Sequence, residues 1–241
     1  MEVSHIAELL RPFLDPAPES PGPGGGPAVL LPTQLETISI YIDILLRWNS
    51  RINLTAVRQP EQIVSRHFGE SLFAARHLFP PLEQSREEEA VRQIEVTDVG
   101  SGAGFPGLPI KIWAPRVHLT LIESNQKKAT FLREIVRALS LTQVNVFAGR
   151  AADFHPIPSS TPLGTPADGE RFGAVVALRA VERFDLIVPV AADLVGPSGR
   201  LAILVGQAQL ERARQLVTSL KWAPPIKVPH SANRFLLLGI K

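Results

Sequence analysis

The chain has 241 residues, is 45% hydrophobic and carries a formal net charge of +2 at pH 7. This size and composition predict a globular protein with a full hydrophobic core, built as one large domain or as a domain with an appendage. The chain contains no cysteine, which excludes disulfides, thiolate metal sites and thiol nucleophiles, and we expect no metal site. Because the net charge is small, any surface for nucleic acid must be local.

The sequence carries no sign of a membrane or of secretion. No apolar run approaches the length that spans a bilayer, and the first residues lack a basic segment followed by an apolar one. We therefore expect a cytoplasmic protein that makes no membrane contact, and we expect it to be a monomer.

The first 92 residues are predicted to form a helical N-terminal region. Apolar side chains recur at helical spacing in three segments, residues 4–14, 34–48 and 61–78. Residues 15–32 are rich in proline and glycine, which is typical of a linker or an insertion. Residues 83–92 are highly charged and are expected to be a solvent-exposed helix or loop.

Residues 93–241 are predicted to form an α/β domain, because strand and helix patterns alternate. Five strands are expected at 94–99, 118–123, 144–148, 174–178 and 201–205, with helices at 106–114, 127–139, 181–194 and 209–220. Residues 226–229 and 234–240 would add two closing strands, and the proline-rich run 156–169 is expected to be a loop. We predict a mostly parallel seven-stranded sheet with helices on both faces, a Rossmann-like arrangement.

A glycine-rich turn follows the first of these strands. Asp98 precedes glycines at every second position, in the order Asp98-x-Gly100-x-Gly102-x-Gly104, with a helix expected from Pro106. The dinucleotide fingerprint requires glycine where Phe105 stands, and no Gly-Lys-Ser/Thr follows for a phosphate loop. The spacing resembles the nucleoside-binding loop of class I S-adenosylmethionine-dependent methyltransferases, although an ordinary tight turn would also satisfy it.

Ligands of an open parallel sheet bind at the carboxyl ends of its strands, so the residues that end each strand are informative. Glu123 ends the second strand, where its carboxylate could accept two ribose hydroxyls or could be a plain surface charge. Asp153 follows the third strand and could border an adenine or cap a turn. Arg179 ends the fourth strand, where an arginine suits a carboxylate, the O6 and N7 edge of guanine, or solvent.

Basic residues that could touch RNA lie in two places. Arg66 and His67 lie in the third predicted helix with Glu70 one turn further on, as either a solvated pair at i, i+4 or a cluster that faces a substrate. Lys127 and Lys128 begin the helix after Glu123. Arg133 and Arg137 share that helix, and the N-terminal region adds Arg47, Arg51 and Arg58.

Together these motifs resemble the RsmG (GidB) family over about residues 34–240. The residues that carry the resemblance are the run from Asp98 to Ile110, Trp48-Asn49 with Asn53-Leu54-Thr55, Arg66-His67 with Glu70-Ser71, Lys128 with Phe131-Leu132, and Arg179-Ala180. The resemblance implies a class I methyltransferase fold. It also implies transfer of a methyl group from S-adenosylmethionine to N7 of a guanine in the decoding region of 16S ribosomal RNA, with the small ribosomal subunit as partner.

By position, the resemblance places cofactor contacts on Gly100, Phe105, Ala151, Ala152 and Arg179, with a class-level ribose contact on Glu123 and the loop residues Asp98 and Gly102 beside them. Substrate RNA would be contacted by Arg66, His67, Lys127 and Lys128. Two positions depart from the family pattern. It commonly has an acidic residue at Ala152 and a lysine at Val205.

Guanine N7 has a free lone pair and loses no proton when it attacks a methyl group, so no side chain is required as acid or base. Other functions stay open on the sequence alone. A methyltransferase of a small molecule or a protein would share the fold, and a non-catalytic S-adenosylmethionine-binding module would keep the loop but transfer nothing. A nicotinamide oxidoreductase is disfavoured by Phe105.

Overall fold

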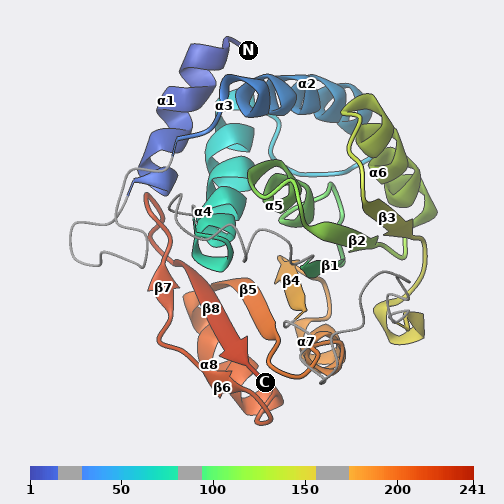
Figure 1. Cartoon of the computed structure of the whole chain (residues 1–241), viewed down its shortest axis with the longest axis vertical. Coiled ribbons are helices and arrows are strands. Elements are labelled where there is room, and N and C mark those ends of the chain that lie inside the picture. The colour runs from blue at the N-terminus through green and yellow to red at the C-terminus, as the bar shows by residue number, and fades with distance from the viewer. Residues whose placement is uncertain (16–28, 81–93, 156–173) are drawn as a thin grey trace, which may run out of the picture.

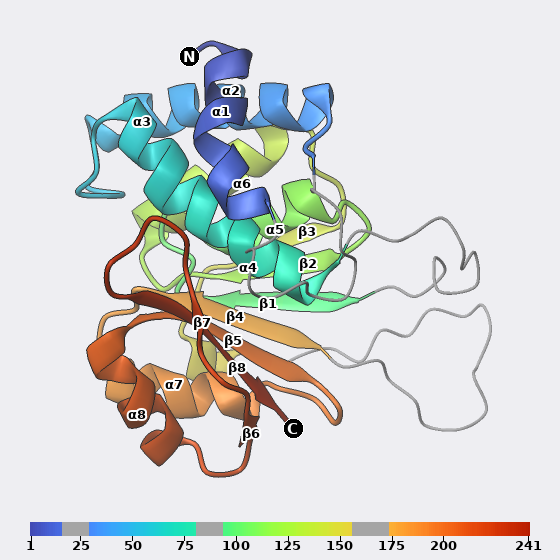
Figure 2. The same cartoon turned by 90° about the vertical axis from the view of Figure 1, so that its left-hand side faces the viewer.

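A twisted sheet separates two layers of helices, as the side view shows (Figure 2). The computed structural model describes residues 1–15, 29–80, 94–155 and 174–241, and Figure 1 gives the order of the elements. The strands are β1 (Glu95–Val99), β2 (His118–Ile122), β3 (Val144–Phe147), β4 (Val175–Arg179), β5 (Arg200–Gly206), β6 (Lys221–Trp222), β7 (Ile226–Lys227) and β8 (Arg234–Ile240).

The sheet has the strand order β3-β2-β1-β4-β5-β8-β6, and β7 pairs with β8 beside this path. Strands β1 to β5 are parallel, and β8 runs antiparallel to β5. The predicted α/β fold with a mostly parallel sheet is confirmed. The number of strands was wrong, because the described residues form eight rather than seven. The additional strand β6 has two residues, which is too short to leave a periodic pattern in the sequence.

The helices of the second half follow the predicted alternation with shifts of a few residues. They are α5 (Gly107–Trp113), α6 (Gln126–Ala138), α7 (Phe184–Asp193) and α8 (Gln207–Leu216), with a short 3₁₀ turn η3 (Ala151–Asp153). Helix α7 begins at Phe184 rather than at residue 181, because Ala180 and Arg183 take left-handed backbone conformations at φ 49° and 55°.

The N-terminal helices are α1 (Val3–Leu14), α2 (Pro32–Asn49), α3 (Pro60–Ile63) and α4 (Glu70–Leu78). The single helix predicted for residues 61–78 is wrong in one respect, because a π-helical segment η1 (Val64–Gly69) separates α3 from α4. Helix α1 packs closely against this segment. A Cβ atom at Gly69 would lie 2.6 Å from the ring of Phe13, so only glycine permits the approach.

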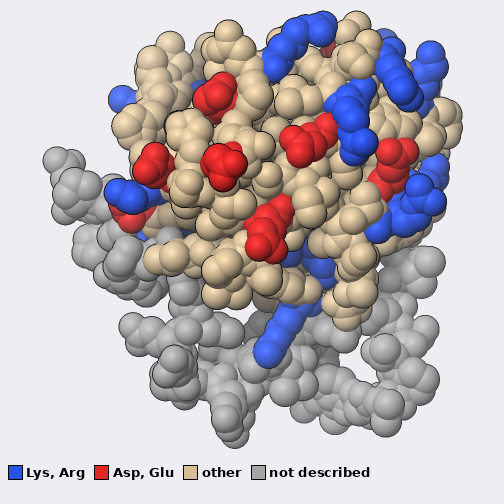
Figure 3. All heavy atoms as spheres, turned by 90° about the horizontal axis from the view of Figure 1, so that it is seen from above, with Lys and Arg blue, Asp and Glu red and all other residues tan. Residues whose placement is uncertain are grey.

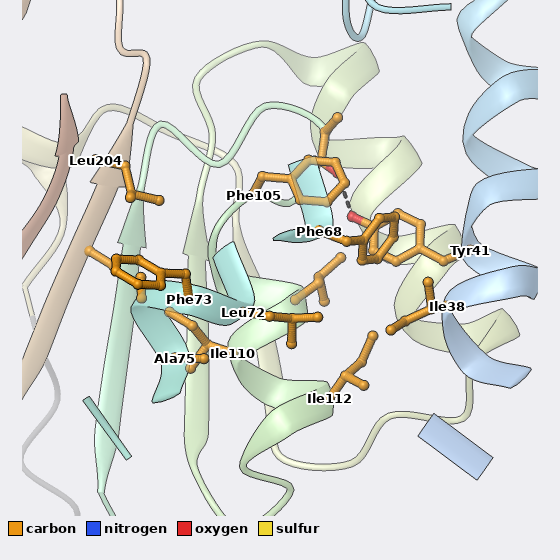
Figure 4. Close-up of a cluster of buried hydrophobic side chains, with 14 of the residues drawn as sticks. Ile38, Tyr41, Phe68, Leu72, Phe73, Ala75, Phe105, Ile110, Ile112 and Leu204 are labelled. Carbon is orange, nitrogen blue, oxygen red and sulfur yellow. Dashed lines mark hydrogen bonds between the residues drawn. The ribbon is translucent and has the colours of Figure 1, made fainter. Parts of the chain in front are cut away.

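Alternate residues of the central strands supply two separate hydrophobic cores, as the two-residue period of a strand requires. In β4, Val175 and Ala177 face the core shared with α5, α6 and the N-terminal helices, and Val176 and Leu178 face the core shared with α7 and α8. The N-terminal helices therefore cover one face of the same sheet. Figure 4 shows part of this first core, where side chains from α2, α4, α5 and β5 meet.

Several expectations fall on residues that the structure leaves undescribed. The predicted linker at 15–32 lies mostly outside the described ranges, and Pro32 already begins α2. The predicted segments 83–92 and 156–169 lie wholly outside them. In the described residues, no helix combines the length and the apolar character needed to cross a bilayer.

Candidate functional site

The parallel register brings the predicted site residues to one edge of the sheet. Val99 pairs with Ile122, and Asp98 pairs with Ala177, so the residues that follow β1, β2 and β4 lie at the same level. In Figure 2 this carboxyl edge faces the side on which the loop before α3 and the loop between β7 and β8 also lie. Gly100, Glu123 and Arg179 thus end neighbouring strands around one location.

The turn after β1 depends on its glycines. Gly100, Gly102 and Gly104 have φ values of 70°, 58° and 88°, a region that favours glycine. A Cβ atom at Gly104 would collide with the Tyr41 hydroxyl and with Leu108, so packing also requires glycine there. At Gly102 the nearest atom to a Cβ would be the Gly100 carbonyl at 3.8 Å, which leaves open space above the loop.

Glu123 closes this space from the neighbouring strand. Its Oε2 accepts a hydrogen bond from the Gly102 N–H at 2.8 Å, and its Oε1 accepts one from the Asn125 N–H at 2.7 Å. A carboxylate has about four lone-pair positions, so both oxygens keep capacity for further donors. This arrangement fits the two hydroxyls of a ribose, with the open face of Gly102 beside them.

The Asp98 side chain is turned into the protein, beneath the glycine-rich turn. Its side chain is fully buried, and its Oδ2 accepts the N–H of Gly107 at the start of α5 at 3.0 Å. Burial raises the pKa of this carboxyl to about 7, against the lowering effect of the bonds from Gly107 and Ser101. Asp98 therefore fixes the glycine-rich loop from beneath, and its side chain does not reach the open face.

Phe105 is also directed into the protein. Its ring is stacked on the ring of Tyr41 and packs edge-on against that of Phe68, as Figure 4 shows. The ring centroids are 5.5 Å and 5.1 Å apart. The side chain leaves the space above Gly102 free, and a cofactor contact of Phe105 would be made by its backbone. Tyr41, which the sequence analysis did not single out, supports the loop by donating a hydrogen bond to the Ala103 carbonyl.

Arg179 lies at the centre of a buried polar network. Its Nε is 3.3 Å from Oε2 of Glu70, its Nη2 is 2.8 Å from Nδ1 of His67, and its Nη1 donates to the His67 carbonyl at 3.4 Å. The Arg179 and Glu70 side chains are each only 6% exposed. Burial lowers the pKa of Arg179 to about 10, partly offset by Glu70, so the guanidinium stays charged at neutral pH.

The i, i+4 pair, one of the two alternatives for Arg66 and Glu70, does not form in this structure, because Glu70 pairs with other arginines. Glu70 is buried and faces Arg179 and Arg234, whose Nη2 lies at 3.5 Å, whereas Arg66 is exposed. The π-helical segment places these residues differently from an ordinary α-helix. A signal for Glu70 was present in the sequence, because a charged residue inside the apolar run from Phe68 to Ala75 needs a buried partner.

Asn49 organises the segment from Trp48 to Thr55. Its Oδ1 accepts from the N–H groups of Leu54 and Thr55 at 2.9 and 3.0 Å, and its Nδ2 donates to the Thr55 carbonyl at 2.9 Å. The Thr55 hydroxyl in turn lies 2.7 Å from Nε2 of His67. The structure therefore joins this segment to Arg179 through His67, which the sequence motifs did not reveal.

The third strand end contributes Ala151, which is buried, and Ala152 and Asp153, which are exposed in the η3 turn. An exposed alanine presents only its backbone and a methyl group to a ligand, while Asp153 stands next to it with a free carboxylate. Val205 is 1% exposed and belongs to the core under α7 and α8. Its side chain is therefore a packing residue of β5.

Basic side chains gather along one side of the molecule, over α6 and the end of α2 (Figure 3). Lys127 is exposed and Lys128 is half-buried at the first turn of α6, close to Glu123 through the Asn125 cap, whose Oδ1 accepts both of their N–H groups. The exposed basic residues of α6, of the end of α2 and of the loop and the η1 segment that follow α2 are Arg47, Arg51, Arg58, Arg66, Lys127, Arg133 and Arg137, and we call this set the basic side. Within the described ranges, no three acidic or histidine side chains are placed to hold a metal ion.

The fold and the site together define a class I S-adenosylmethionine-dependent methyltransferase. A family model described as rRNA small subunit methyltransferase G (GidB) matches residues 34–230. The chain belongs to this family, which confirms the resemblance seen in the sequence.

Individual relatives agree with this assignment. The chain is 35% identical over 179 residues to the ribosomal RNA small subunit methyltransferase G of Desulfitobacterium hafniense, a match of 74% of this chain and 66% of that protein. It is 35% identical over 215 residues to the same enzyme of Roseiflexus castenholzii, covering 86% of this chain and 83% of that protein. A ribosomal protein methylase from Lactobacillus delbrueckii matches the fold with a TM-score of 0.52 at 12% identity, over 73% of this chain and 80% of that structure.

Proposed function

We propose that this protein transfers a methyl group from S-adenosylmethionine to N7 of a guanine in the decoding region of 16S ribosomal RNA, acting on the small ribosomal subunit. The observation that carries the proposal is the Glu123 carboxylate at the glycine-rich turn, where its Oε2 accepts a hydrogen bond from the Gly102 N–H at 2.8 Å. Membership of a family of ribosomal RNA small subunit methyltransferases supports the class of substrate.

The residues of this chain fit the donor. Glu123 would accept the ribose hydroxyls, Gly100 and Gly102 would let the backbone approach the nucleoside, and the exposed η3 turn would border the adenine. Asp153, which is exposed next to Ala152, would supply the acidic side chain that Ala152 lacks. S-adenosylmethionine supplies an electrophilic methyl group when it is bound.

The contribution of the protein to the reaction is alignment and exclusion of water. Because N7 of neutral guanine carries a free lone pair, the residues around the site need only hold the base in line with the methyl group. The buried network of Glu70, Arg179 and His67 gives the wall of the site a fixed shape. We therefore propose that no side chain acts as a general acid or base.

The basic side supports binding of RNA. It lies over α6, whose first turn follows Glu123, so a phosphate backbone that crosses it would bring a base to the strand ends. We also propose that the protein acts as a monomer. A ribosomal substrate implies that the protein works in the cytoplasm.

The test is labelling of small ribosomal subunits that lack the modification with radioactive S-adenosylmethionine, followed by mapping of the labelled base. Cleavage of the RNA chain after reduction and aniline treatment would identify N7-methylguanine. Glu123→Gln is expected to lose most of the activity. Glu95→Gln, which changes a half-exposed carboxylate at the start of β1, should keep it. Label on protein or on another base would overturn the proposal.

A further inference from the structure

The hydrogen-bond network around His67 fixes the direction of each proton. All three nitrogens of Arg179 are donors, and Nη2 lies 2.8 Å from Nδ1 of His67. Nδ1 must therefore be an acceptor, which leaves the imidazole proton on Nε2. The ring of His67 is also uncharged, because burial and the nearby Arg179 lower its pKa to about 3.

The proton on Nε2 then determines what Thr55 can do. Nε2 donates to Oγ1 of Thr55 at 2.7 Å, and the N–H of Val57 donates to the same oxygen at 3.1 Å. A hydroxyl oxygen has two lone pairs, and both are occupied. The Thr55 hydroxyl must therefore act as a donor towards another group, and none of the described residues accepts a hydrogen bond from it.

The loop that carries Thr55 lies on the side of the sheet to which the carboxyl ends of the parallel strands point (Figure 2). Its partner His67 has its ring 5.0 Å from the ring of Phe105 in the glycine-rich turn, and Arg179 ends β4 beside it. Thr55 itself comes from the loop between α2 and α3 and is partly exposed, whereas the cofactor residues come from the strand ends. This loop also carries the exposed Arg51 and Arg58 and contains no acidic residue from 51 to 59, which suits an RNA chain.

We propose that the Thr55 hydroxyl donates a hydrogen bond to O6 of the target guanine and selects guanine over adenine. This inference rests on the proposed function. Arg179 itself cannot read the base in this structure, since its nitrogens face Glu70 and His67. Because Arg179 donates to Nδ1 of His67, the neutral imidazole donates through Nε2 to Thr55, and the Thr55 hydroxyl is left to donate in turn. Guanine presents the acceptor O6 next to N7, whereas adenine presents an amino group there, which is a donor and would face the donor hydroxyl.

The test is a coupling between the hydroxyl and O6. Small subunits are reconstituted with 16S RNA that carries either guanine or 2-aminopurine, which lacks O6, at the mapped position. Single-turnover methyl transfer is measured for the wild type, Thr55→Val and Thr55→Ser. With guanine we expect Thr55→Val to be about tenfold slower, the scale of one neutral hydrogen bond, and Thr55→Ser to be close to wild type. With 2-aminopurine the wild type and Thr55→Val should be equally slow.

Other outcomes would overturn the inference in distinguishable ways. If Thr55→Val acts through the fold, or if the hydroxyl binds a phosphate, the rate of methyl transfer would fall by the same factor with the guanine RNA and with the 2-aminopurine RNA. A hydroxyl that binds the cofactor would raise the calorimetric Kd for S-adenosylmethionine in Thr55→Val, and we expect that Kd to be unchanged. Absence of any N7 methylation by the wild type would instead refute the proposed function and leave a different substrate to be sought.

Discussion

Nη2 of Arg179 lies 2.8 Å from Nδ1 of His67, although the two residues are 112 positions apart in the chain. One ends a central strand of the methyltransferase sheet, and the other lies in the π-helical segment of the N-terminal region. Glu70 neutralises the arginine from the start of α4 and also contacts Arg234 at the start of β8. The N-terminal helices are therefore tied electrostatically to the wall of the site.

Replacement of Glu70 by glutamine should destabilise the fold strongly. It would leave the buried Arg179 guanidinium without a counter-charge, and loss of one partner of a buried pair costs about 3 kcal/mol. Urea denaturation followed by tryptophan fluorescence would measure the free energy of unfolding. Asp185→Asn is the matched control, because it breaks an ion pair with Arg212 whose side chains are 49% and 55% exposed, and it should barely shift the midpoint. Equal effects of the two changes would contradict the buried pair.

The stability of the protein should fall in acid partly because of His67. Its pKa is about 3 in the folded state and 6.5 as a free side chain, so between these values the unfolded chain binds a proton that the folded protein does not. The contribution is therefore fully present above pH 6.5 and decreases as pH falls towards 3. We expect His67→Asn, which keeps an acceptor near Arg179, to lose about 3 kcal/mol less than the wild type between pH 7 and pH 4. Parallel curves for the two proteins would contradict a neutral His67.

Two alanine substitutions in the glycine-rich turn should have different effects. Gly102→Ala places a methyl group in open space, so we expect a loss of about 1 kcal/mol from its positive φ and a Kd for S-adenosylmethionine at least about tenfold higher. Gly104→Ala collides with Tyr41 and Leu108 and should lower stability by several-fold more than Gly102→Ala. Calorimetry and thermal melting separate the two outcomes. Unchanged cofactor binding in Gly102→Ala would mean that the turn does not line the site.

Methyl transfer to the small subunit should weaken steeply with salt. A plot of the logarithm of kcat/KM against the logarithm of salt concentration is expected to be linear with a negative slope. Lys127→Gln should reduce the slope by about 1, since each phosphate contact contributes about one released counterion. Lys221→Gln, an exposed lysine in β6 at the far end of the sheet, serves as the control and should leave the slope unchanged. A flat salt response of the wild type would contradict the basic side as an RNA surface.

Local patterns in the sequence were enough to predict the fold and the glycine-rich turn of the site. Alternation of strand and helix predicted the parallel sheet, and the glycine spacing after Asp98 predicted the turn that faces Glu123, because both depend on backbone geometry within a few residues. The residues that resemble the family also lie in short motifs, and the family assignment followed from them.

Only the tertiary structure decided which side chains face the site and which support it. Asp98 and Phe105 were expected as cofactor contacts, yet both are turned into the protein, and Glu70 pairs with Arg179 rather than with Arg66. The network of side chains from Glu70 through Arg179 and His67 to Thr55 joins three distant segments. Burial and hydrogen-bond partners over such separations arise when helices pack on a sheet, and no period or spacing along the chain encodes them.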